Sequence, residues 1–148
     1  MKGNSYKNFY FMLLVSFVIM YSVMFLNVAK FEHIYLSTTR FYMAILMVAP
    51  MAIFMILMMG DMFKDKKKNK LIISLSIILF ILVLVSLRTQ TPIKDEQYIM
   101  AMIPHHSSAI LTSREANLND SEVQKLAEDI IETQEREIAQ MKEILERL

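Results

Sequence analysis

The chain has 148 residues, and its 16 basic and 15 acidic side chains give a net charge of +1. A hydrophobic content of 55% with only 2 Gly and 3 Pro excludes a disordered chain, a collagen-like fibre and a turn-rich all-β domain. Cys is absent, which excludes disulfides, thiolate zinc sites, iron–sulfur clusters and a cysteine nucleophile. We therefore expect an all-α protein, in which any metal site uses His, Met or carboxylate side chains.

Three uncharged apolar segments predict a membrane domain over residues 1–88. They cover residues 9–29, 41–60 and 71–87, close to the roughly 20 residues that cross about 30 Å of hydrocarbon. The first is longer than the apolar core of a signal peptide, so we interpret it as an anchor. We expect three transmembrane helices in a lipid bilayer, followed by a separate domain over residues 89–148.

Lysines near the ends of these segments predict the orientation. Lys2 and Lys7 precede the first segment, and five lysines fill the loop between the second and third: Lys64, Lys66, Lys67, Lys68 and Lys70. The positive-inside rule places both groups in the cytoplasm, so residues 89–148 lie outside it. A lysine run can also form a nucleic-acid or anionic-lipid patch, but its position between two spans favours the topological role, and we expect no nucleic-acid partner. The expected location is a bacterial inner or plasma membrane.

Methionines form a stripe in the second segment, recurring every four residues at Met43, Met47, Met51, Met55 and Met59. The stripe has two interpretations, a track of soft ligands for a monovalent ion or flexible packing between helices. Packing is the more common role of such a stripe. The three segments contain no Asp, Glu, Lys, Arg or His, which argues against a transporter of charged substrates.

Residues 89–148 predict an extracytoplasmic helical hairpin. Thr91-Pro92 and the acidic residues that follow favour a helix over residues 92–117, and Asn119 with Glu122 favours a capped second helix over residues 120–148. The inward positions of the second helix step by three and four: Val123, Ala127, Ile130, Gln134, Ile138, Met141, Leu145 and Leu148. Two helices alone bury too little surface to be stable, so we expect a homodimer that forms a four-helix bundle.

The densest group of ligand-type side chains is Met100, Met102, His105 and His106. Met102 and His106 are four residues apart and share one helical face, which the seam spacing turns inward. His105 lies beside that seam and could reach a neighbouring helix. Thioether and imidazole without thiolate favour Cu(I) or Ag(I). The alternative is a hydrogen-bonded histidine pair with packed methionines.

Two other polar residues have expected places. If the hairpin turns near residue 118, Gln134 lies level with Met102 and Ile130 lies level with His106. We expect Gln134 to hydrogen-bond a histidine, or the Met100 carbonyl that Pro104 deprives of its helix donor. His33, in the loop between the first two segments, is expected to be solvated.

The chain resembles the CopM-like family in two stretches of the hairpin. The first is YIMAMIPHHSSAI over residues 98–110, and the second contains Gln134 and Glu137-Ile138-Ala139-Gln140-Met141. The family is ferritin-like and extracytoplasmic, is catalogued as a domain of unknown function, and has copper- and silver-binding members. The resemblance implies that the metal ligands are Met102, His105, His106 and Met141. We expect Gln134 and Met100 to lie beside them.

Two differences from the family bear on this chain. Members often carry two such hairpins, whereas this chain has one, in keeping with a homodimer. They commonly have another Met where this chain has Thr112, so the ligand set here is thinner.

We expect a membrane-anchored protein, not an enzyme, that holds Cu(I) or Ag(I) outside the cytoplasm for sequestration or hand-off to a metal-exchange partner. The main alternative is an anchored dimerisation or assembly module without metal. A histidine phosphotransfer hairpin lacks an acidic residue after its histidines and lies away from ATP. A di-iron enzyme needs Glu three residues before His, where this chain has Met102 and Ile103.

Overall fold

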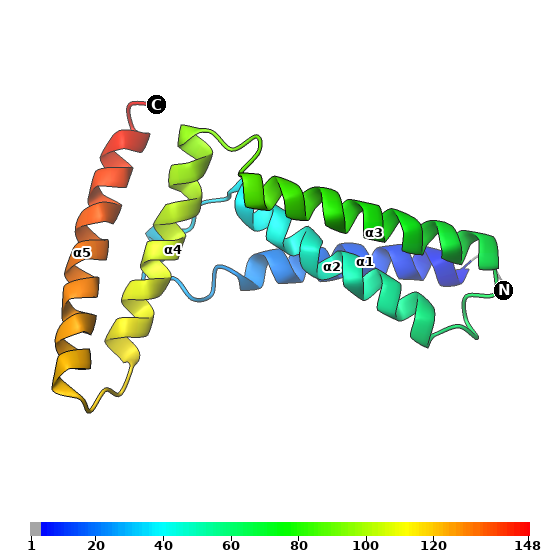
Figure 1. Cartoon of the computed structure of the whole chain (residues 1–148), viewed down its shortest axis with the longest axis horizontal. Coiled ribbons are helices and arrows are strands. Elements are labelled where there is room, and N and C mark those ends of the chain that lie inside the picture. The colour runs from blue at the N-terminus through cyan, green and yellow to red at the C-terminus, as the bar shows by residue number, and fades with distance from the viewer. Residues whose placement is uncertain (1–3) are drawn as a thin grey trace. The chain divides into compact units, whose positions relative to one another are not determined.

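The computed structural model describes residues 4–148 and is all-α (Figure 1). Its α-helices in chain order are α1 (Asn4–Val23), α2 (Thr38–Met58), α3 (Lys66–Thr89), α4 (Asp95–Glu115) and α5 (Ser121–Leu145), with a 3-10 turn η1 (Phe31–His33) before α2. The described residues form two compact units. We call residues 4–23 and 39–92 the three-helix unit, and residues 24–38 and 93–148 the hairpin unit.

The three-helix unit contains the expected apolar helices. Each of α1, α2 and α3 is long and apolar enough to cross a membrane. Their buried contacts centre on Phe9 from α1, Ala52 and Ile56 from α2, and Ile72 from α3, with Phe63 between α2 and α3. The helices extend beyond the predicted segments 41–60 and 71–87 at their N-terminal ends, because backbone helix can continue through polar residues.

The start of α3 shows how the lysine run joins the helix. The Asp65 carboxylate accepts hydrogen bonds from the backbone N–H groups of Lys67 and Lys68, both at 3.1 Å. This cap satisfies donors that the first helical turn leaves free. Lys66, Lys67 and Lys68 therefore lie in the first turn of a helix rather than in an irregular loop, while Lys64 precedes the cap and Lys70 follows in the next turn.

The first predicted segment, residues 9–29, is wrong at its end, because α1 stops at Val23. Residues 24–29 are part of the hairpin unit instead. Two 2.8 Å hydrogen bonds attach them to α4, from Asn27 Nδ2 to Ser108 Oγ and from the Ala29 N–H to Ser107 Oγ. The apolar composition of residues 9–29 does not reveal that some of their hydrogen-bond donors are bonded to residues far along the chain.

In the hairpin, α4 and α5 lie side by side (Figure 1), and both begin later than predicted. The first starts at Asp95 rather than near residue 92, with Asp95 and Glu96 in its first turn. The second is capped by Asp120 rather than Asn119. The Asp120 carboxylate accepts from the N–H groups of Glu122 and Val123 at 2.9 and 3.0 Å, and a carboxylate at this position also favours the helix dipole.

The core of the hairpin unit differs from the predicted seam. Its buried residues are Ile99, Ile103 and Ile110 of α4 and Ile138 of α5, packed against Ala29 and Tyr35 among others. The predicted inward positions of α4 at Met102, His106 and Ala109 are half-buried, and Ser113 is also half-buried. The prediction considered α5 and a second copy of the hairpin, whereas α4 is packed between α5 and residues 24–38, which turns a different face inward.

The predicted register between α4 and α5 is also wrong. His106 lies against Glu137 rather than Ile130, and Met102 lines one pocket with Met141 rather than lying level with Gln134. The register is shifted because the chain after Glu115 is extended, so that it runs beyond the end of α4 before α5 begins. The first residues of α5, such as Val123 and Leu126, are consequently exposed, and the paired part of α5 starts later.

Candidate metal-binding site

A pocket of about 470 Å³ lies at the seam between α4 and α5. We call it the Met–His pocket; its lining residues are Asp95, Tyr98, Ile99, Met102, His106, Glu137, Gln140, Met141 and Ile144. It contains three of the four predicted ligands, since α4 supplies Met102 and His106 and α5 supplies Met141. The observed register thus brings Met141 to the α4 residues, which the register expected from the sequence did not.

His106 is held at both ring nitrogens. Its Nδ1 lies 2.9 Å from the Met102 carbonyl oxygen, and its Nε2 lies 2.8 Å from Glu137 Oε2. A carbonyl only accepts hydrogen bonds, so Nδ1 carries the hydrogen in this contact and Nε2 is the nitrogen on the Glu137 side. The side chain is 12% exposed, which leaves the ring fixed but within reach of the pocket.

Glu137 is a residue of the candidate site that the sequence reasoning missed. It lies four residues before Met141, so the two share one face of α5. That spacing was a usable signal, but the expected register placed Ile130 opposite His106 and so gave Glu137 no role. Gln134 donates from Nε2 to Glu137 Oε2 at 3.5 Å, so it reaches the histidine only through this carboxylate and does not meet the Met100 carbonyl.

His105 and Met100 lie outside the Met–His pocket of a single chain. His105 is exposed, with its ring centroid 6.0 Å from that of His106, because adjacent helical residues point about 100° apart. Met100 Sδ accepts a hydrogen bond from Gln97 Nε2 at 3.6 Å. Both residues are therefore placed to act beyond the pocket rather than in it.

The donor set of the pocket combines soft and hard groups. Within residues 4–148, no group of three or more His, Asp or Glu side chains is placed to hold a metal ion. The Met–His pocket offers two thioethers, one imidazole and two carboxylates, those of Asp95 and Glu137. The thioethers and the imidazole suit a soft monovalent ion, whereas the carboxylates are ligands that Mg²⁺, Ca²⁺ and Mn²⁺ prefer.

The prediction of a solvated His33 is wrong. Only 5% of this residue is exposed, and its Nδ1 lies 2.8 Å from Ser107 Oγ of α4. Burial is the main cause that lowers the pKa of His33, and the charge of Lys142 lowers it further. Because Ser107 is 74 residues away in the chain, no local pattern indicated this contact.

Comparisons with known proteins give a family but no described activity. Residues 84–145 match the family described as Domain of unknown function (DUF305). An uncharacterized protein of Acanthamoeba polyphaga mimivirus is 38% identical over 138 residues, covering 91% of this chain and 89% of that protein. This viral relative gives no support to the expected bacterial origin. No solved structure matches the chain.

Proposed function

The chain belongs to the same family as the mimivirus protein and carries a DUF305 domain over residues 84–145, and we propose that it is a membrane-anchored protein that binds Cu(I) or Ag(I). One observation carries the proposal: Met102, His106 and Met141, from two helices, line a single pocket. Their thioether and imidazole groups are the ligand types that soft monovalent ions prefer. The function is binding, for sequestration or transfer to a metal-exchange partner, rather than catalysis.

The hydrogen bonds of His106 support this assignment. The contact between Nδ1 and the Met102 carbonyl fixes the ring, as is usual for metal-binding histidines, and makes Nε2 the ligating nitrogen. An ion at Nε2 would displace the proton that the 2.8 Å contact to Glu137 Oε2 requires, and this proton would be released to solvent. The carboxylate stays beside the site, where its negative charge offsets that of the ion.

The proposed setting is a bilayer crossed by α1, α2 and α3, with the hairpin unit outside the cytoplasm. The three helices have the length and apolar composition for this. The orientation is supported by the lysines around α3 and at the N-terminus. A reporter fused after Leu148 tests the orientation, because it would be accessible to an impermeant label only if the hairpin lies outside.

We further propose that a second copy completes a four-helix bundle over the Met–His pocket. Tyr98, which lines the pocket, is 54% exposed, and Leu126 on α5 is 58% exposed. Burying such apolar surface favours association. His105 is exposed near the pocket and is the predicted ligand that a single chain does not use, so a partner copy could use it.

The alternative function, an anchored dimerisation module without metal, is favoured by the same exposed apolar side chains. Leu126 and Val123 lie on α5 away from the Met–His pocket lining. They would be buried in a dimer whether or not an ion binds. The two functions are therefore separated by metal binding rather than by oligomeric state.

The deciding experiment is a Cu(I) titration of the full chain in detergent micelles, against a chromogenic Cu(I) chelator. The variants are His106→Ala, which removes the histidine of the pocket, and His105→Ala, which removes the exposed histidine that a partner copy could use. We expect stoichiometric binding by the wild type, a loss of about a hundredfold in affinity for His106→Ala, which corresponds to roughly 2.7 kcal/mol, and a smaller loss for His105→Ala. Light scattering on the same samples gives the oligomeric state.

The outcomes separate the alternatives clearly. Equal losses in both variants would indicate that His105 is supplied by a partner copy, provided that light scattering shows a dimer. Wild-type protein that is folded and dimeric but does not compete with the chelator would exclude the metal function and leave the assembly module.

A further inference from the structure

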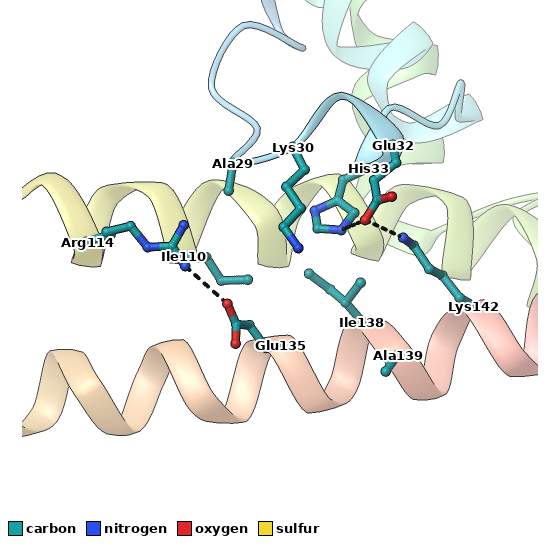
Figure 2. Close-up of a pocket in the computed structure, with 10 residues that line it drawn as sticks. All are labelled: Ala29, Lys30, Glu32, His33, Ile110, Arg114, Glu135, Ile138, Ala139 and Lys142. Atoms are coloured by element: carbon teal, nitrogen blue, oxygen red, sulfur yellow. Dashed lines mark hydrogen bonds and ion pairs between the residues drawn. The ribbon is translucent and has the colours of Figure 1, made fainter.

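A second cavity, of about 250 Å³, lies in the hairpin unit between residues 24–38, α4 and α5 (Figure 2). We call it the Lys30 cavity; it is lined by Ala29, Lys30, Glu32, His33, Ile110, Arg114, Glu135, Ile138, Ala139 and Lys142. It shares no lining residue with the Met–His pocket. The α5 residues that line the two cavities alternate along the chain. Because successive helical residues point about 100° apart, the two groups lie on opposite sides of the seam between α4 and α5.

The charges around the Lys30 cavity leave one cation unpaired. Arg114 and Glu135 form an ion pair at 3.1 Å, and Lys142 and Glu32 form another at 3.2 Å. Within residues 4–148 the Lys30 side chain makes no hydrogen bond or ion pair. Figure 2 shows it reaching from residues 24–38 toward α5, between the two pairs. The cavity lining therefore has one more positive than negative charge, and its unpaired ammonium belongs to the solvent-exposed Lys30.

His33 offers a second donor to the same cavity. Ser107 Oγ already accepts the Ala29 N–H at 2.8 Å, so its own hydrogen is available to His33 Nδ1 at 2.8 Å. A neutral His33 then carries its hydrogen on Nε2. The nearest carboxylate oxygen, Glu32 Oε1, is 3.5 Å from Nε2, which is long for a hydrogen bond. This buried N–H is thus only weakly used in the structure.

The electrostatics of the cavity agree with a neutral histidine in a positive field. The pKa of His33 is lowered by burial first and then by the charges of Lys142 and Lys30, against the opposing effect of Glu32. The pKa of Glu32 is lowered mainly by its hydrogen bond to Lys142. Glu32 is therefore ionised and paired with Lys142, and the charge of Lys30 also lowers its pKa, although the two form no ion pair.

The other walls of the cavity are apolar. Ile110 and Ile138 form its floor, and Ala29 and Ala139 add small side chains at its edge (Figure 2). The volume is below the roughly 300–1,000 Å³ of pockets for drug-sized ligands, so the occupant is small. An apolar floor gives little to an inorganic anion, which retains its water better in solution.

From the free Lys30 ammonium, the His33 N–H and the apolar floor, we propose that the Lys30 cavity binds a small organic monocarboxylate with a short aliphatic body. The carboxylate accepts hydrogen bonds from Lys30 Nζ and His33 Nε2, and its aliphatic body lies on Ile110 and Ile138. Such a ligand contacts all three elements around the cavity and stabilises residues 24–38 on the hairpin. This site is independent of the proposed metal function.

The test is ¹⁹F NMR of the full chain in detergent micelles with 4,4,4-trifluorobutyrate as the probe. The variants are Lys30→Gln, which removes the charge, and Ala139→Leu, which fills the cavity from an exposed helical position. We expect saturable binding by the wild type, and about tenfold weaker binding in each variant. Lys125→Gln, on an exposed position of α5 outside the cavity, is the matched control and should bind as the wild type does.

Ligand analogues test each part of the proposal separately. Trifluorobutanol lacks the charge and trifluorobutylamine reverses it, so both should bind more weakly than the carboxylate. Inorganic phosphate should compete poorly because it has no aliphatic body. The proposal is overturned if Lys30→Gln binds like the wild type, if the alcohol or the amine binds as well as the carboxylate, or if phosphate displaces the probe at equal concentration.

Discussion

His33 and His106 lie on opposite sides of the hairpin seam and are held in contrasting ways. His33, 5% exposed, has a neutral hydroxyl on Nδ1, a carboxylate no closer than 3.5 Å to Nε2, and cations nearby. His106, 12% exposed, has a carbonyl on Nδ1 and a carboxylate 2.8 Å from Nε2, with two thioethers in the same pocket. One histidine is suited to fixing a structure and the other to binding a cation.

The contrast shows that the neighbours of a histidine determine its use more than its local sequence does. His105-His106 looked like a metal motif and His33 looked like a solvated residue. In the structure His105 is exposed, His106 is paired with a residue of α5, and His33 is buried against α4. Each of the following predictions tests one side of this comparison.

The largest effect is expected from Ser107→Ala, at the place where residues 24–38 pack on the hairpin. Ser107 is fully buried and serves both the Ala29 N–H and His33 Nδ1. Leaving two such groups without a partner costs about 1–3 kcal/mol each, so we expect a loss of roughly 3 kcal/mol in local stability. Hydrogen exchange of the Ala29 amide, measured by mass spectrometry of the full chain in micelles, should accelerate by about a hundredfold.

Ser108→Ala is the control for this prediction. Ser108 Oγ accepts one hydrogen bond, from the exposed Asn27 side chain at 2.8 Å. Water can replace that partner, so the exchange of residues 24–38 should change by less than about threefold. Similar acceleration in both variants would contradict the special role of the buried hydroxyl.

The sequence predicted the elements of the fold better than the contacts between them. Three apolar helices and a helical hairpin follow from composition and periodicity, which are local properties of α-helices. The end of α1 at Val23 does not, because the hydrogen bonds that retain residues 24–29 are made to Ser107 and Ser108. Only the folded chain brings those partners together.

The candidate site was predicted in its residue types but not in its geometry. Met102, His106 and Met141 do line one pocket, yet Glu137 was missed and His105 lies outside. The error came from the register, since a turn at residue 118 does not allow for an extended connection after Glu115. Spacing along one helix is fixed by its geometry, whereas the register of two helices depends on their connection.

The next largest effect is expected from the thioethers of the Met–His pocket. Met102→Leu and Met141→Leu keep the volume and apolar character of the pocket but remove sulfur. We expect each to weaken Cu(I) binding about tenfold, equivalent to roughly 1.4 kcal/mol, in competition with a chelator. Met100→Leu is the control, because its sulfur contacts Gln97 outside the pocket, and it should leave the affinity unchanged.

If Met100→Leu instead weakens binding as much as Met102→Leu, the ion does not sit in the Met–His pocket of one chain. If none of the three variants changes the affinity, sulfur does not contribute to binding. Either result would remove the chemical contrast between the two sides of the hairpin.

A smaller effect is expected from pH, through His33. Because its pKa in the folded protein is below its ordinary value of about 6.5, the unfolded state takes up the proton first as the pH falls. Folding stability is then full above pH 6.5 and decreases below it, by at most about 1.4 kcal/mol per pH unit, until the lowered pKa is passed. Hydrogen exchange of residues 24–38, corrected for its intrinsic pH dependence, should show this loss.

The matched variants for the pH prediction are His33→Asn and His105→Asn. The first removes the buried titrating group, so the decrease of stability just below pH 6.5 should disappear. The second alters an exposed histidine and should leave it intact. The prediction is wrong if His105→Asn abolishes the pH effect and His33→Asn does not.

The smallest effect is expected from the ion pair between Lys142 and Glu32, which line the Lys30 cavity. Lys142 Nζ lies 3.2 Å from Glu32 Oε1, but the Glu32 side chain is 62% exposed, and exposed pairs contribute about 0–1 kcal/mol. Lys142→Gln should therefore accelerate exchange of residues 24–38 by less than about threefold at low salt, and by less still in 1 M salt, where screening weakens the wild-type pair as well. A larger, salt-sensitive loss would mean that surface charge holds this segment on α4. A small loss would mean that the main contact holding residues 24–38 on the hairpin is the buried Ser107 hydroxyl, which Ala29 and His33 share.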